Sequence, residues 1–411
     1  METTSGAQEI KVYGYRWVVL LVFMFIQLIM QTFWICYAPI TRVAAEAYGV
    51  SDMDIGLLAM LFMYIYIPLA IPASWAIDTW GFKKALGLGA VMMGVFGLLR
   101  GLFIQDYTLA LIMTIGLAAA QPLFLNSGTK MVANWFPLGE RATIVGLAGI
   151  SQLLGIVVGQ IATPFMVQAW GLGPAMLFYG VVGAVSALLF LVFAREKPPT
   201  PAGYEQRVLM LDGLKLIVKM RDFYLLAFIV FVVNAIFNGV STWVEVIVRP
   251  KGMDIDQAGL IGGLLMIGGI VGLVVVPRVS DSLRRRKPVM IIVALLAIPF
   301  VAMTAFANSF GLLAVVILLQ GFFIMGLMPV ALQYATEMCY PAPEGTSMGM
   351  FYLAGQLSVV AVTFMGWSNE TYGSFTPSLL ICAGAMAVGV VLLLLMKESR
   401  MIQAAQPAAA D

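Results

Sequence analysis

The chain has 411 residues and a net charge of +2, and 61% of its residues are hydrophobic while only 11% are charged. Soluble globular proteins hold about 45–50% apolar and about 25% charged residues, so this composition excludes a soluble domain and predicts an integral membrane protein in contact with the lipid bilayer. Histidine is absent and the three cysteines lie apart in apolar segments, so the sequence predicts neither a metal site nor a cofactor. The small net charge gives no indication of nucleic-acid binding, and no nucleotide loop or nucleophile–base pair indicates an enzyme.

A helix that spans a bilayer needs about 20 mostly apolar residues. Divided at charges and Gly/Pro clusters, the chain gives twelve such spans and an all-α fold. In the first half they lie near residues 16–42, 53–77, 84–104, 108–134, 142–168 and 174–194. In the second half they lie near residues 223–248, 257–280, 288–308, 311–336, 346–368 and 375–396. The first apolar run is too long for a cleavable signal peptide.

These spans predict two six-helix bundles, residues 16–194 and 223–397, joined by a charged linker at 195–222. The N-terminal segment 1–15 and the tail 398–411 are short and polar. Within the linker, residues 206–221 are amphipathic, and we expect them to lie along the membrane surface.

Lysine and arginine predict the orientation, because they collect on the cytoplasmic side of membrane proteins. With the N-terminus inside, nineteen of the 23 basic residues fall on one face. The opposite face keeps only Arg42, Arg100, Arg249 and Lys251. We therefore expect a multi-pass protein of the cell membrane with cytoplasmic termini and linker.

A repeat relates the two halves. Residues 136–152 recur as residues 340–356, with Pro137, Glu140 and Gln152 matched at an offset of 204 residues. Asp78 and the basic residues after it recur around Asp281 at an offset of 203. Parallel repeats in a membrane chain are a signature of the major facilitator architecture, which places two pseudo-symmetric six-helix bundles side by side.

Residues 78–84, Asp-Thr-Trp-Gly-Phe-Lys-Lys, resemble the signature loop of the major facilitator superfamily between its second and third helices. There the aspartate can face a helix N-terminus of the other half and latch the halves on the cytoplasmic side. Thr79 stands where the family has arginine, so part of the charge relay is missing. A solvated, positively charged turn is the alternative. The predicted gating residues are Asp78, Gly81, Lys83, Arg141, Asp281, Arg284 and Glu344.

Glycines mark the fifth and eighth spans. The fifth carries Gly146, Gly149, Gly155 and Gly159, and the eighth carries six glycines between residues 259 and 272. Small residues let helices approach closely, so we expect these two spans to pack against each other as scaffold.

Polar residues in the middle of the spans are candidates for a solute site, because carrier sites lie near the midplane between the repeats. Gln31 and Asn234 occupy equivalent positions, 203 residues apart. The candidate binding residues are Gln31, Trp34, Gln121, Asn126, Gln152, Asn234, Asn238, Tyr352 and Gln356. Amides in hydrocarbon also bond neighbouring helices, so a structural role stays open for each of them. Their recurrence on the first, fourth, seventh and eleventh spans favours one shared cavity.

No Asp, Glu, Lys, Arg or His stands near the middle of a predicted span. A central charge usually marks a proton relay or a strongly charged substrate, so its lack argues against both. Arg100, Lys130 and Glu245 stand near span ends and could reach a cavity from there. An aromatic and amide lining suits a neutral polar molecule, or a cation held by ring faces.

Four stretches resemble the feline leukaemia virus subgroup C receptor family: residues 33–37, 72–81, 240–242, and 340–347 with Gln356. That family consists of twelve-helix carriers associated with choline and ethanolamine uptake and with haem export. The resemblance implies that its choline-cage tryptophan falls on Trp34 and its cage glutamines on Gln121 and Gln356. The cage tyrosine of the seventh helix falls on Asn238, and this departure weakens the case for a quaternary ammonium.

We therefore expect a monomeric carrier of a small organic solute, choline-like or ethanolamine-like or a neutral metabolite, that works by alternating access and facilitated diffusion. An ion- or proton-coupled symporter or exporter is the second hypothesis, with Arg100 or Glu245 as the coupling groups. A non-transporting receptor on a transporter fold is the third.

Overall fold

The computed structural model describes residues 12–137, 140–199, 217–339 and 344–398. The first part contains α1 (Arg16–Ile35), η1 (Ala38–Ile40), α2 (Thr41–Tyr48), α3 (Asp52–Trp80), α4 (Phe82–Leu102), α5 (Tyr107–Trp135), α6 (Arg141–Trp170) and α7 (Leu172–Phe193). The second contains α9 (Arg221–Thr242), α10 (Val244–Val248), η3 (Arg249–Lys251), α11 (Ile255–Leu283), α12 (Lys287–Phe306), α13 (Phe310–Cys339), α14 (Glu344–Gln356), α15 (Val359–Tyr372) and α16 (Thr376–Leu395). Twelve stretches of these helices are long and apolar enough to cross a membrane, which confirms the predicted number. Most of the amphipathic segment 206–221 and both chain ends lie outside the described residues.

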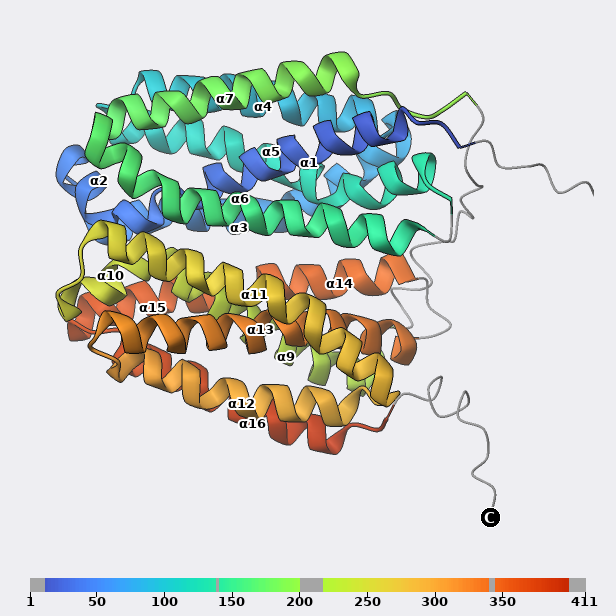
Figure 1. Cartoon of the computed structure of the whole chain (residues 1–411), viewed down its shortest axis with the longest axis vertical. Coiled ribbons are helices and arrows are strands. Elements are labelled where there is room, and N and C mark those ends of the chain that lie inside the picture. The colour runs from blue at the N-terminus through green and yellow to red at the C-terminus, as the bar shows by residue number, and fades with distance from the viewer. Residues whose placement is uncertain (1–11, 138–139, 200–216, 340–343, 399–411) are drawn as a thin grey trace, which may run out of the picture.

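The helices form two bundles that lie side by side, α1–α7 and α9–α16 (Figure 1). In the first bundle α1 packs on α6, α3 on α5 and α4 on α7. The equivalent helices of the second bundle make the same pairs: α9 packs on α14, α11 on α13 and α12 on α16. The sequence repeat is therefore also a repeat of helix packing. Contacts between the bundles join α6 to α11 and α3 to α14 and α15.

The two ends of the molecule can be told apart by where the chain enters and leaves it. The terminal end, as we call it, carries the start of α1 and the ends of α7 and α16, on the right of Figure 1. We call the opposite end distal. Trp17, Trp75 and Trp80 are exposed toward the terminal end, and Trp170 and Trp367 toward the distal end. Two such aromatic belts are typical of the two interfaces of a bilayer.

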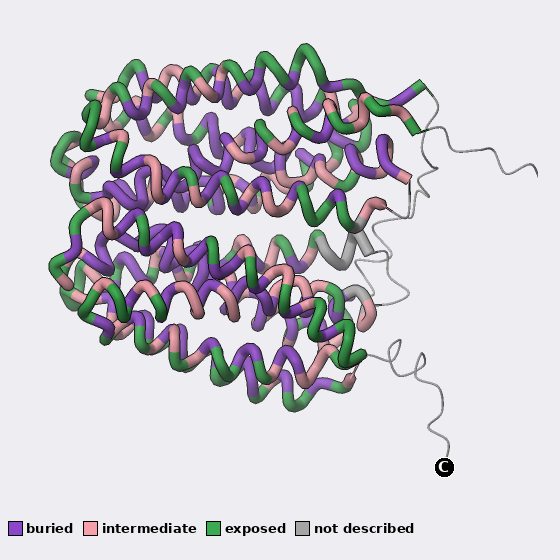
Figure 2. The backbone as a smooth tube through the Cα atoms, viewed as in Figure 1, coloured by how far each residue is buried: buried purple, intermediate pink, exposed green. Residues whose placement is uncertain are grey.

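Buried residues follow the inner faces of the helices, and exposed residues follow their outer faces (Figure 2). Many of those exposed residues are large and apolar, among them Leu21, Ile71 and Leu188. An apolar exterior of this kind is suited to hydrocarbon rather than water.

Three spans that the sequence predicts as uninterrupted are broken. The first span bends after Ile35 into η1, where Pro39 lacks an N–H for a helical bond. The seventh span breaks at Trp243, between α9 and α10. The eleventh breaks between α14 and α15, where the N–H of Ser358 bonds the carbonyl of Gly355 three residues back instead of four. Spans one and seven, which are equivalent in the repeat, thus break toward the distal end, and span eleven breaks near its middle.

Candidate functional site

Trp243 fills the distal part of the interface between the bundles. It is 1% exposed, and its indole N–H donates to the carbonyl of Val362 in α15 at 3.0 Å. A methyl group added at Gly56 of α3 or at Gly366 of α15 would overlap its ring. The ring therefore occupies a slot formed by two glycines, one from each bundle. Because neither glycine has a side chain, the bundles can approach closely here.

Arg249 closes the distal end further out. Its guanidinium donates to Asp52 of the first bundle at 2.9 Å and to Glu245 of its own bundle at 2.9 Å. Burial alone would lower the pKa of Arg249, but the hydrogen bonds to Glu245 and Asp52 raise it. The arginine thus stays charged and joins one carboxylate from each bundle. The side chain of Glu245 is nearly buried, so it depends on this arginine for a partner.

Two further contacts join the bundles between the distal end and the middle. The side-chain amide of Gln160 in α6 donates to the carbonyl of Ser241 at 2.9 Å. The hydroxyls of Tyr64 in α3 and Thr363 in α15 are hydrogen-bonded at 2.6 Å. The closed part of the interface thus reaches from Arg249 down to the middle of α3.

The terminal end is open in the described part of the chain. Methyl groups added at Gly146 or Gly149 of α6, or at Gly349 of α14, would meet no other atom within 4 Å. Tyr352, one turn before the break in the eleventh span, is 52% exposed. The interface therefore closes distally and opens toward the terminal end.

Polar contacts at the terminal end lie within each bundle. In the first bundle, Lys130 forms an ion pair with Asp78 at 3.4 Å and donates to the carbonyl of Ile77. The carboxylate of Glu196 accepts the backbone N–H groups of Phe82 and Lys83 at 3.1 and 2.7 Å. It thereby caps α4, where the N–H groups and the helix dipole favour an anion.

The second bundle repeats this arrangement. Arg286 bonds Asp281 and pairs with Glu337 of α13, and the carboxylate of Glu398 accepts the N–H groups of Arg286 and Lys287 at the start of α12. The sequence analysis did not single out Glu196 or Glu398. A signal for them exists, because basic–Glu pairs end both halves at 195–196 and 397–398.

The other predicted gating residues also lie at the terminal end. Gly81 has a positive φ of 87° and precedes α4, directly against the Glu196 carboxylate. Arg141 donates to the carbonyls of Phe136 and Ala133, which tie α6 to the end of α5. Arg284 caps α11 in a left-handed conformation with a φ of 49°. Glu344 begins α14, and its side chain lies outside the described part.

The predicted glycine contact between spans five and eight holds only for part of the set. Gly259 and Gly262 of α11 lie against Gln160, as predicted. Gly155 and Gly159 of α6 instead lie against α1, and the later glycines of α11 lie against α13. Helical spacing shows that such residues share a face, but not which neighbour that face meets.

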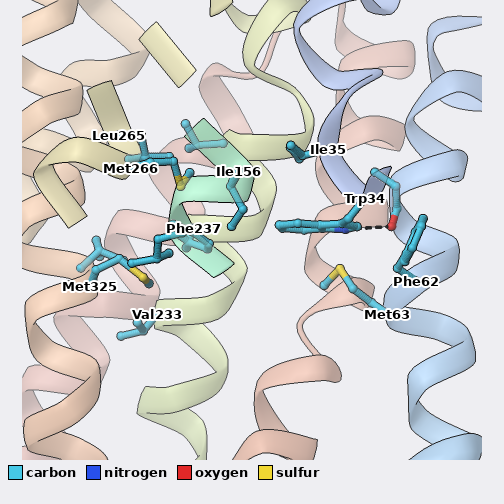
Figure 3. Close-up of a cluster of buried hydrophobic side chains, with 14 of the residues drawn as sticks. Trp34, Ile35, Phe62, Met63, Ile156, Val233, Phe237, Leu265, Met266 and Met325 are labelled. Carbon is cyan, nitrogen blue, oxygen red and sulfur yellow. Dashed lines mark hydrogen bonds between the residues drawn. The ribbon is translucent and has the colours of Figure 1, made fainter. Parts of the chain in front are cut away.

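Trp34 lies near the end of α1, beside Phe62 and Met63 of α3 (Figure 3). Its indole N–H donates to the carbonyl of Ala59 at 3.2 Å, so the ring face is what remains for a further contact. Ile156 of α6 separates it from an apolar cluster of the second bundle that includes Phe237 (Figure 3).

In each bundle an amide of the first helix bonds a polar group of the helix equivalent to α6. In the first, Gln31 of α1 donates to Gln152 of α6 at 3.3 Å. In the second, Asn238 of α9 donates to the hydroxyl of Ser358, at the break between α14 and α15, at 3.1 Å. Asn234 lies against Gly355 in the same region. Gln356 is the last residue of α14, directly before the break.

The remaining candidates are placed differently. Gln121 of α5 is buried, and its side-chain oxygen has no donor in the described part of the chain. Asn126 accepts from Tyr66 at 2.9 Å and donates to Ser74 at 3.1 Å, which ties α5 to α3. Both partners of Asn126 are protein groups, so its contacts are those of a structural amide.

The predicted charged cavity ends are all engaged by protein groups. Arg100 is buried against the rings of Phe33 and Tyr37 and lies 3.5 Å from the carbonyl oxygen of Phe33. That carbonyl is close to the end of α1, where a helix dipole favours a cation. Lys130 and Glu245 are occupied by Asp78 and Arg249, respectively.

A family model for the Major Facilitator Superfamily matches residues 21–282 and 247–410. The chain belongs to the Major Facilitator Superfamily. It is a multi-pass membrane transporter, and the twelve spans in two bundles are the fold of that superfamily.

Several characterised and uncharacterised proteins are similar to this superfamily member. An uncharacterised MFS-type transporter of Caenorhabditis elegans is 27% identical over 95% of this chain and 70% of its own length. The choline/ethanolamine transporter FLVCR2 of Homo sapiens is 27% identical over 92% of this chain and 77% of its own length. These matches support the resemblance to the feline leukaemia virus subgroup C receptor family.

Among solved structures, the fold is similar to a bacterial homologue of the human lysosomal transporter Spinster, described as inward-facing and unoccupied. The TM-score is 0.71 at 14% identity, over 94% of this chain and 96% of that one. At this identity the likeness concerns the fold alone.

Proposed function

We propose that this superfamily member carries a small amine or amino alcohol across the cell membrane by facilitated diffusion. The observation that carries the proposal is a pair of amide contacts, one in each bundle: Gln31–Gln152 joins α1 to α6, and Asn238–Ser358 joins α9 to the break between the equivalent helices α14 and α15. Together with Trp34 they provide hydrogen-bonding groups and one ring face near the middle of the spans. The names of the similar choline/ethanolamine transporters support the same class of solute.

The transport cycle exchanges which end of the interface is closed. The strong excess of lysine and arginine at the terminal end makes that end cytoplasmic, so the structure faces inward. In the outward-facing state Trp243 leaves its glycine slot and Arg249 releases Asp52. The terminal ends of the two bundles then meet. Asp78 releases Lys130 and instead contacts the N-terminal turn of α14, which begins at Glu344.

The contacts of the two candidate coupling groups, Arg100 and Glu245, favour facilitated diffusion over ion coupling. Arg100 lies against the carbonyl end of α1, and Glu245 is neutralised by Arg249. Both charges are thus engaged by protein groups of the closed distal part. In the described spans the other Asp, Glu, Lys and Arg residues stand toward helix ends, where a proton relay through the midplane cannot use them.

Counterflow in proteoliposomes tests the proposal. Vesicles are preloaded with ethanolamine or choline, no ion gradient is imposed, and uptake of the labelled solute is followed at pH 6 and pH 8. We expect transient accumulation that is insensitive to a protonophore. Accumulation that requires an imposed proton gradient would establish coupling, and absence of exchange with every small amine would refute the solute class.

A further inference from the structure

Four buried glutamines have side-chain oxygens without a donor in the described part of the chain: Gln160 lies in the closed distal part of the interface, and Gln27, Gln31 and Gln121 lie within the first bundle. The Nε2 group of Gln27 donates to the carbonyl of Phe124 at 2.7 Å, which fixes the orientation of that amide. Its Oε1 is buried and has no donor in the described part of the chain. The same is true of Oε1 of Gln31, whose Nε2 donates to Gln152, and of Oε1 of Gln121. Buried acceptors are normally paired, so three on neighbouring helices call for an explanation.

The second bundle adds an acceptor at the equivalent position. Asn234 donates through Nδ2 to the carbonyl of Val230 at 2.8 Å, so its side-chain nitrogen is directed toward its own helix. No described donor reaches its Oδ1. Asn234 and Gln31 are equivalent in the repeat, so each bundle contributes one such acceptor from its first helix, α1 or α9. The terminal torsion of an amide side chain is soft, so small rotations can bring these oxygens to a ligand.

Aromatic surface in this region comes from Trp34, Tyr66 and Tyr352, and of these Tyr352 is exposed toward the open terminal end. Trp34 offers one ring face, since its N–H is occupied by Ala59. Tyr66 is turned to Asn126, and its hydroxyl is used there. A cation held mainly by ring faces needs several of them, whereas a cation held by oxygens needs N–H groups of its own.

We propose that the site selects an ammonium group that carries N–H donors, and that it prefers a primary ammonium to a quaternary one. This inference rests on the proposed function and narrows its substrate class. A primary ammonium brings three donors, which can pair with oxygens of Gln31, Gln121 and Asn234. A trimethylammonium brings none and leaves those oxygens desolvated and unpaired, which a site built from hydrogen-bond acceptors rejects.

A methylation series tests the inference on the wild-type protein. Ethanolamine, N-methylethanolamine, N,N-dimethylethanolamine and choline differ only in how many N–H groups have become N–CH₃. Each competes for labelled ethanolamine in the counterflow assay. We expect the inhibition constant to rise at each step, with choline about tenfold or more weaker than ethanolamine. Choline that competes as well as ethanolamine, or better, would overturn the inference.

Two variants assign the preference to these oxygens. Gln121→Leu and Asn234→Leu should each weaken the binding of ethanolamine severalfold and leave the binding of choline nearly unchanged. The inhibition constants of the four amines should therefore differ less from one another than in the wild-type protein. Gln320→Leu is the matched control, because that buried amide of α13 accepts from Thr304 away from this region. If the inhibition constant rises with methylation as much in both site variants as in the wild-type protein, these oxygens do not set the preference. If none of the four amines exchanges while another solute does, the proposed function fails rather than the selectivity.

Discussion

The two ends of the bundle interface are held by different contacts. At the distal end the contacts cross between the bundles: Trp243 fills a slot that includes Gly56, and Arg249 joins Asp52 to Glu245. At the terminal end, the polar contacts of the described residues stay within a bundle, as in Lys130–Asp78. Contacts inside a bundle keep that bundle rigid, whereas contacts between the bundles determine which end of the interface is closed. The difference shows why each bundle can move as one body about the midplane.

The largest effect is expected from removing the distal arginine. Arg249→Met removes the ion pair with Asp52 that crosses the interface. It also leaves the nearly buried Glu245 carboxylate of its own bundle without a partner, a loss that typically costs about 3–5 kcal/mol. Distal closure should therefore weaken strongly, and the outward-facing population should grow. Cysteine labelling of the distal end from outside intact cells measures this. Arg42→Met is the control, because the Arg42 pair with Glu46 is exposed and within one helix. Equal labelling of the two variants would contradict a role of Arg249 in closure.

Filling the tryptophan slot comes next. Gly56→Leu places a side chain where the Trp243 ring lies, and overpacking of this kind costs about 1–3 kcal/mol. Because the clash exists only in the closed distal interface, the expected result is a shift of about 5- to 150-fold toward the outward-facing state. Counterflow should slow accordingly. Gly384→Leu, at a glycine with open space around it, should leave transport unchanged.

A smaller effect concerns the rigidity of the first bundle. Glu196→Gln weakens the carboxylate cap of α4, and loss of such a cap costs about 0.5–2 kcal/mol. Thermal unfolding in detergent should shift to lower temperature, with little change in the affinity for the solute. Glu370→Gln, at an exposed position, is the comparison. A change in affinity without a change in stability would show that Glu196 acts on the solute site instead.

The smallest effect is a pH dependence at the distal end. Burial lowers the pKa of Lys251 to about 8 from its usual 10.5, while its ammonium donates to the carbonyls of Thr304 and Ala307 at the end of α12. Between these two values the unfolded chain binds more protons than the folded one, so stability should rise with pH in that window. Lys251 is only partly buried, so the rise is modest. Lys251→Met should show a flatter profile from pH 8 to pH 10, and identical profiles would refute the link.

Apolar runs and the internal repeat were sufficient to predict the architecture from the sequence. The twelve spans and the equivalence of Gln31 and Asn234 needed only hydropathy and an offset of 203 residues. Trp243 was not predicted, because a tryptophan near a span end is equally compatible with a lipid interface. Its role depends on Gly56 and Gly366, which are distant in sequence. The break before Ser358 was missed as well, because no proline marks it.

The most direct test of alternating access is one distance across the terminal end. Spin labels at Val145 of α6 and Gly349 of α14, in a background without the native cysteines, report the separation of the bundles by double electron–electron resonance. We expect a long distance that matches the open terminal end, and a second, shorter distance whose share grows in Gly56→Leu. A single distance that neither ethanolamine nor Gly56→Leu changes would contradict the claim that the bundles exchange which end is closed.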